Sequence, residues 1–276
     1  MLNPFRRSIR LPGKLGACLI TGTEKIRCGY GNGDCLLLDF RHGVFAVADA
    51  TERFPQASRH LLERLAAELD RSGAPTSASQ FDRLLARIWS RQPFIHKTTL
   101  SCVVLPPNGR TGPALVANDG DSTVTVVSAG SNEILYRTGV DMNFAGRSRI
   151  PNRVETLGLE DPKAAILLTT DGISSALLGS YAGIADHPDE VPDRIAGGIE
   201  RHGDGAEIDD IGMIALSCQR LNGSSSETIV IGGTTPGLET AFVNGGGENT
   251  SMDRWAPIER WKTDPALLAK AGISIR

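Results

Sequence analysis

Aspartates stand in this sequence where short apolar runs begin or end. One follows residues 44–48 directly, another follows residues 166–168 closely, and the full set is Asp34, Asp49, Asp121, Asp171, Asp209 and Asp210. A carboxylate at a strand end is held at the rim of a sheet, and several converging carboxylates repel one another strongly in a partly buried site. A bound divalent cation removes that repulsion, and oxygen ligands alone favour Mg²⁺ or Mn²⁺ over zinc or copper. Each aspartate taken alone also fits an ordinary turn, because its side chain bonds nearby backbone groups.

The number and spacing of the cysteines argue against a zinc site and against disulfide bonds. They are odd in number, none has CxxC spacing, and most lie within apolar runs: Cys18, Cys28, Cys35, Cys102 and Cys218. We interpret them as small hydrophobic residues in a reducing cytosol, and therefore expect a cytoplasmic protein.

Composition excludes two further classes of function. The 276 residues are 40% hydrophobic and 22% charged, with a net charge of -3 and a pI near 6.0. Nucleic-acid binders usually have a basic patch and a high pI, so we expect no nucleic-acid partner. No apolar run approaches 18 residues, so we expect no membrane-spanning helix. The oligomeric state stays open.

The apolar pattern predicts the elements that hold these aspartates. Residues 36–38 and 44–48 form a hairpin about a turn at residues 41–43, and further strands are expected over 99–105, 114–117, 123–127, 132–136, 164–168 and 211–216. Helices are expected over 55–69, 79–91 and 191–201, with a short one after Asp171. Because hairpins dominate, we expect two mostly antiparallel sheets packed face to face with helices outside, an α+β fold.

The chain changes character near its C-terminal fifth. Glycine and serine clusters interrupt it from residue 222 onward, leaving one possible strand at 228–231 and one possible helix at 264–270. We therefore predict a domain over residues 1–221 and a partly flexible C-terminal extension over residues 222–276.

Six segments, taken in order, resemble the motifs of the type 2C metal-dependent protein phosphatases (PPM family). They are residues 32–34 (Asn-Gly-Asp), 44–49 (Val-Phe-Ala-Val-Ala-Asp), 96–100 (His-Lys-Thr-Thr-Leu), 116–122 (Val-Ala-Asn-Asp-Gly-Asp-Ser), 167–173 (Leu-Leu-Thr-Thr-Asp-Gly-Ile) and 208–214 (Ile-Asp-Asp-Ile-Gly-Met-Ile). The resemblance covers roughly residues 15–218 and implies a four-layer α/β/β/α sandwich with a metal cluster at one end.

The resemblance also implies a role for each matching residue. Asp49 would bridge two metal ions, Mn²⁺ or Mg²⁺, and the Ala50 carbonyl would bind metal where the family has a glycine carbonyl. Asp171 and Asp209 would complete the pair. Asp34 would act through metal-bound water, and Asp121 would share a third, weaker metal with Asp171. The activity implied is direct hydrolysis of phosphoserine or phosphothreonine in a signalling phosphoprotein, by a metal-activated water.

The sequence departs from the family pattern around this site. The family glycine after the bridging aspartate is Ala50, and Glu52 in the same loop either adds a carboxylate near the metals or faces solvent, which we favour. The family arginine that grips phosphate corresponds best to Arg27, although Arg27 lies about two residues too far from Asp34. The N-terminal arginines at positions 6, 7 and 10 are alternatives, and Lys97 is a further candidate for phosphate contact, although we interpret it as a surface lysine. These departures leave a second hypothesis open, a phosphatase-like regulatory or binding module with little or no catalysis.

Overall fold

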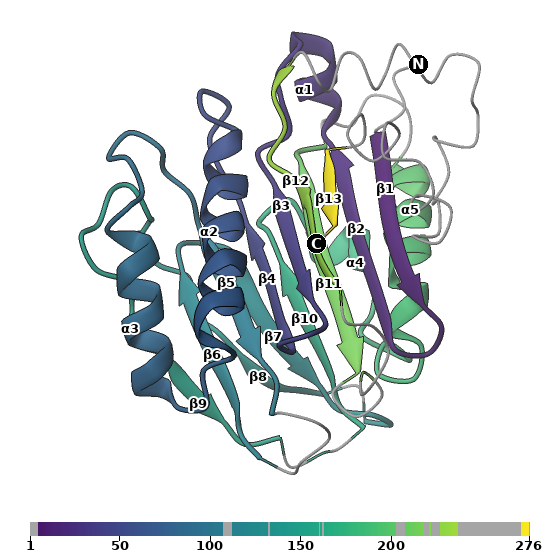
Figure 1. Cartoon of the computed structure of the whole chain (residues 1–276). Helices are drawn as coiled ribbons and strands as arrows, with labels where there is room; N and C mark the ends of the chain where they lie inside the picture. The colour runs from purple at the N-terminus through teal and green to yellow at the C-terminus, as the bar shows by residue number, and fades with distance from the viewer. Residues whose placement is uncertain are drawn as a thin grey trace.

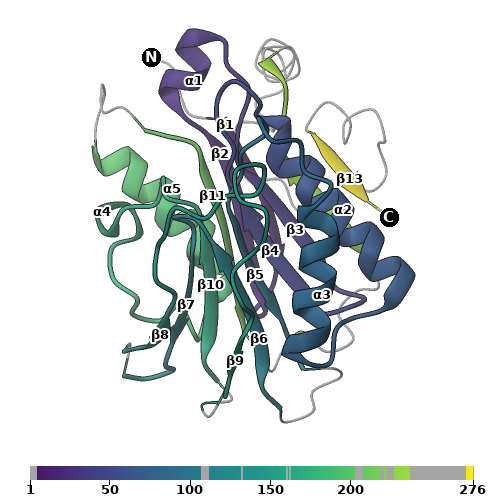
Figure 2. The ribbon, with the colours of Figure 1, turned by 90° about the vertical axis from the view of Figure 1, so that its left-hand side faces the viewer.

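The structure, a computed structural model, describes residues 5–106, 112–131, 133–159, 161, 163–202, 208–217, 221, 227–236 and 272–275. The described strands form two antiparallel sheets that face each other (Figures 1 and 2). The six-stranded sheet has the order β1-β2-β11-β10-β7-β8, with the bounds Phe5–Leu11, Leu15–Thr21, Ile211–Ser217, Ala165–Thr169, Thr123–Val127 and Ile134–Arg137. The seven-stranded sheet has the order β13-β12-β3-β4-β5-β6-β9, with the bounds Ile273–Ile275, Thr228–Gly232, Cys35–Asp39, Val44–Ala48, Leu100–Val104, Ala114–Asp119 and Glu155–Leu157.

Helices cover the outer face of each sheet. Figure 2 shows α2 (Gln56–Ser72) and α3 (Ala78–Trp89) on one side of the strands, and α4 (Ser175–Leu178) and α5 (Val191–His202) on the other. A short helix, α1 (Thr23–Cys28), lies at the top of the molecule in Figure 1, and a single 3₁₀ turn, η2 (Pro188–Glu190), precedes α5.

The central strands are apolar on both faces because both faces are covered. In β3, Leu36 and Leu38 belong to the core between the sheets, while Leu37 between them packs with the core under α2 and α3. In β10, Ile166 faces the central core and Leu167 faces the core under α4 and α5. Three buried layers of side chains therefore separate four layers of secondary structure, which confirms the predicted α+β sandwich.

The predicted hairpin and the predicted strands and helices up to residue 217 are present, with ends shifted by a few residues. Gly43 has φ 65° in the turn between β3 and β4, a conformation that glycine adopts without strain. The hairpin of β1 and β2 was not predicted. Its strand β1 carries Arg6, Arg7 and Arg10 among apolar residues, which hides the strand pattern.

The predicted strand at 228–231 is β12, and it pairs with β3 inside the seven-stranded sheet. β13 pairs with β12 in turn, so two strands of the predicted extension belong to the sandwich. The boundary at residue 221 stays a prediction, and the helix expected over 264–270 lies outside the described residues. Within the described ranges, no helix combines the length and the hydropathy needed to cross a bilayer.

Candidate metal centre

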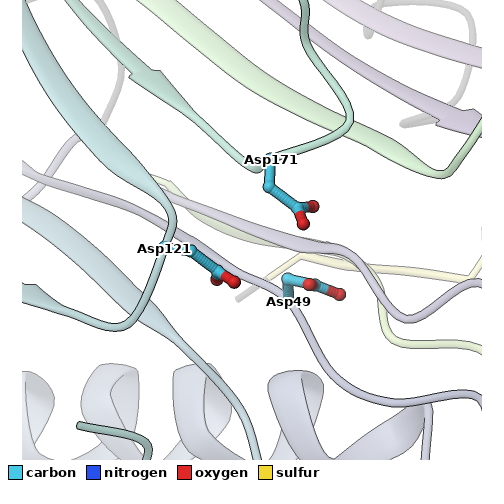
Figure 3. Close-up of side chains that lie close together, drawn as sticks. All are labelled: Asp49, Asp121 and Asp171. Atoms are coloured by element: carbon cyan, nitrogen blue, oxygen red, sulfur yellow. The ribbon is translucent and has the colours of Figure 1, made fainter. Parts of the chain in front are cut away.

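Three aspartates converge at one end of the sandwich. Asp49 directly follows β4, Asp121 lies in the turn between β6 and β7, and Asp171 lies two residues beyond the end of β10, so both sheets contribute. One carboxylate oxygen of each residue lies within 4.8 Å of the other two, and Figure 3 shows the side chains pointing into a common space. Asp49 and Asp121 are half-buried and Asp171 is exposed, so the group opens to solvent on one side.

The hydroxyl of Thr99 links the segment that carries Asp49 to the turn that carries Asp121. Thr99 Oγ1 accepts a hydrogen bond from the Asp49 backbone N–H at 2.8 Å and lies 2.7 Å from the Ser122 hydroxyl. Gly120 has φ 93°, and a Cβ there would lie 2.8 Å from the Thr99 methyl group. The turn that carries Asp121 therefore needs glycine at position 120 to approach Thr99 this closely.

Asp34 lines the same pocket as the three aspartates and is buried. Its Oδ2 accepts a hydrogen bond from Thr170 Oγ1 at 2.7 Å, and its carboxyl is also hydrogen-bonded to Asp49. Burial, followed by the negative charge of Asp49, raises the pKa of the Asp34 carboxyl well above its ordinary value. Burial and the charge of Asp171 raise the pKa of Asp49 in the same direction. Burial and mutual repulsion therefore disfavour the charged forms of these carboxyl groups, a cost that a bound divalent cation would reduce.

Two neighbouring aspartates, Asp209 and Asp210, have different surroundings. Asp210 is buried, and its two oxygens accept hydrogen bonds from the backbone N–H groups of Gly22, at 2.8 Å, and Gly33, at 2.9 Å. Burial raises the pKa of Asp210 to about 7 against these hydrogen bonds. Asp209 is largely exposed, and its Oδ1 lies 3.5 Å from the Lys25 ammonium.

The predicted metal-site residues line a single pocket. Asp34, Asp49, Ala50, Asp121, Asp171 and Asp209 all line it, together with three basic residues, Lys25, Lys97 and Arg147. The carbonyl oxygen of Ala50 lies against Gly33, where a Cβ would be only 2.1 Å from it, so glycine is required in the Asn-Gly-Asp segment. Glu52 also lines the pocket, with 53% of its side chain exposed, and its Oε1 accepts a hydrogen bond from Lys25.

The arginines proposed from the sequence lie elsewhere. Arg27 is exposed on α1 and is not among the residues that line the pocket, so its position does not support the predicted phosphate contact. Arg7 is buried and donates to Thr21 Oγ1, and Arg10 pairs with Asp193 on α5. Sequence reasoning missed Lys25 and Arg147. Lys25 is only two residues from Arg27 on the same short helix, and Arg147 lies in a loop without a periodic pattern.

Comparison with known proteins identifies the fold. No family model matches the chain, and no curated protein matches it in sequence. Among solved structures, the photosystem II phosphatase PBCP matches with a TM-score of 0.54 at 17% identity, covering 73% of this chain and 97% of that one.

Two bacterial phosphatases give similar matches. Serine/threonine phosphatase Stp1 from Staphylococcus aureus matches with a TM-score of 0.57 at 12% identity, covering 76% of this chain and 96% of that one. The catalytic domain of serine/threonine protein phosphatase PstP, solved in complex with two manganese ions, matches with a TM-score of 0.51 at 14% identity, covering 78% and 99%. The chain therefore has the fold of the PPM-type serine/threonine phosphatases.

Proposed function

We propose that this chain is a divergent member of the type 2C family, a metal-dependent phosphatase that hydrolyses phosphoserine or phosphothreonine in proteins. One observation carries the proposal. In the fold of serine/threonine phosphatases, Asp49, Asp121 and Asp171 present carboxylate oxygens within 4.8 Å of one another at the mouth of a pocket. We also retain the prediction of a cytoplasmic signalling role.

The donor set fits a hard divalent cation. All the converging ligands are carboxylate oxygens, which suit Mg²⁺ and Mn²⁺. Among the described residues, Asp121 Oδ1 is buried without a hydrogen-bond partner, which leaves it available as a ligand. Bound there, the cation would lower the pKa of a coordinated water and neutralise charge on a substrate phosphate.

Basic residues at the rim support phosphate binding. Lys97 and Arg147 line the pocket from two segments that the backbone hydrogen bonds between Thr98 and Ala145 hold together. Gly146 contributes to this contact, since a Cβ there would lie 2.3 Å from the His96 carbonyl oxygen. We propose that Arg147 binds the phosphate oxygens, because a guanidinium can donate two parallel hydrogen bonds to them.

We assign Asp34 the task of orienting the attacking water. Its carboxyl is fixed by Thr170 and Asp49, and it lies at the inner wall of the pocket. Attack on phosphorus by water needs no covalent phosphoenzyme. No cysteine or serine nucleophile is therefore part of the proposal.

The test is hydrolysis of a phosphothreonine peptide with Mn²⁺, with and without a chelator. We expect chelator-sensitive turnover that is lost in Asp49→Asn and Asp171→Asn and retained in Asp70→Asn, an aspartate at the far end of α2. Mn²⁺ binding without turnover would favour the regulatory module. The observation that motivates this alternative is the ion pair between Glu52, in the altered loop, and Lys25 on α1. Turnover that survives both the chelator and Asp49→Asn would refute the proposal.

A further inference from the structure

Lys25 places a buried positive charge inside the acidic pocket. It lies on α1, is only 8% exposed, and lines the pocket with Asp49 and Asp171. Its Nζ lies 2.7 Å from Glu52 Oε1 and 3.5 Å from Asp209 Oδ1. One ammonium therefore holds two carboxylates on this side of the pocket.

The ammonium is charged at neutral pH. Burial favours the neutral amine, but the hydrogen bond with Glu52 and the charges of Asp209 and Asp210 outweigh burial and raise the pKa of Lys25. Lysine carries three donors and no acceptor, so it neutralises carboxylates in much the same way as a cation.

The carboxylates near Lys25 are not free to form a second cation site. Asp209 lies outside the group of three aspartates that converge. Its Oδ1 accepts a hydrogen bond from the Asp210 backbone N–H and lies 3.5 Å from the Lys25 ammonium. Asp210 has both oxygens committed to backbone N–H groups. A cation placed between Asp209 and Asp171 would also meet repulsion from the ammonium.

We propose that Lys25 takes the place of a second divalent cation, so that the chain holds a single ion at Asp49, Asp121 and Asp171. The inference rests on the proposed metal site, and it revises the expected role of Asp209. Asp209 is then a partner of Lys25, and the pocket combines one exchangeable cation with one built-in positive charge.

The experiment is a titration of the full chain with Mn²⁺, read by calorimetric stoichiometry and by the electron paramagnetic resonance of the bound ion. The wild type is expected to bind one Mn²⁺ and to give the spectrum of an isolated ion. Lys25→Met, which keeps an unbranched side chain without the ammonium group, is expected to bind two and to give a spin-coupled spectrum. Lys163→Met, the same change at an exposed site outside the pocket lining, should still bind one.

Two further variants keep the inference testable if Lys25→Met folds poorly. Lys25→Arg preserves the charge and should retain one ion, and Asp209→Asn should also bind one ion, with an affinity within about twofold of the wild type. A wild type that binds two ions overturns the inference, as does a folded Lys25→Met that still binds one. A single bound ion without hydrolysis would refute the proposed function and leave this inference standing, whereas no bound ion would refute both.

Discussion

The substitution Asp121→Asn separates the stability of the metal-free site from its ability to bind a cation. It replaces the carboxylate by a carboxamide of the same shape and removes one negative charge. Asp121 Oδ1 has no hydrogen-bond partner among the described residues, so the change breaks no contact that the structure records for that atom. We therefore expect the metal-free variant to be more stable than the metal-free wild type.

The size of the effect follows from the spacing of the carboxylates. Two unit charges at the upper limit of this spacing, 4.8 Å, repel by about 3 kcal/mol at an effective dielectric constant of about 20. Solvent at the open side of the group screens this repulsion, leaving about 1–2 kcal/mol. For a domain of this size, each kcal/mol corresponds to about 2–4 °C in Tm, so Asp121→Asn is expected to raise the metal-free Tm by several degrees.

The assay is thermal unfolding in chelator and in excess Mn²⁺. A ligand at about 100 times its Kd stabilises the folded state by about 2.7 kcal/mol, so the wild type should gain more from Mn²⁺ than the variant does. Asp70→Asn is the control, because Asp70 lies outside the pocket lining and forms a surface ion pair with Arg41 at 3.5 Å. The reasoning is refuted if metal-free Asp121→Asn is less stable than the wild type, or if its response to Mn²⁺ is unchanged.

Three further predictions concern the same pocket. Thr170→Val removes the donor to Asp34 and the acceptor of the buried Gly212 backbone N–H. It should therefore lower the free energy of unfolding, measured by urea denaturation, by about 1–3 kcal/mol, and a loss below about 0.5 kcal/mol would contradict this. In chelator, the free energy of unfolding should fall as pH rises from about 4 to about 7. The Asp210 pKa is raised from 3.8 to about 7, so over this range the folded state keeps a proton that the unfolded chain releases. Thermal unfolding against pH checks the sign, and stability that rises over this range would contradict the prediction. Arg147→Met should lower kcat/KM for a phosphothreonine peptide about tenfold, whereas Arg27→Met should not; the reverse result would restore Arg27 as the phosphate ligand.

Much of the fold could be predicted because the buried strands are short apolar runs. Residues 36–38, 44–48 and 164–168 are apolar on both faces, and the aspartates beside them mark the sheet ends that meet at the pocket. The hairpin of β1 and β2 could not be predicted in this way, because Arg7 is buried among its apolar neighbours. The position of β12 beside β3 is likewise a long-range pairing that no local pattern specifies.

The division of roles between Asp209 and Asp210 shows why the site was only partly predictable. The two residues are adjacent and identical in type, and only one turns inward. That choice depends on the backbone N–H groups of Gly22 and Gly33, which are distant in sequence and close in the fold. The sequence pattern does not indicate a site role for Lys25, because its place in the pocket depends on how α1 packs against the rest of the fold.

The most direct test of the account is a crystal structure of the protein grown with Mn²⁺, with the ion located by its anomalous scattering. The account predicts an anomalous peak within direct ligand distance of the carboxylates of Asp49, Asp121 and Asp171. Absence of a peak among these three side chains, in crystals where they are ordered and Mn²⁺ is in excess, would contradict it.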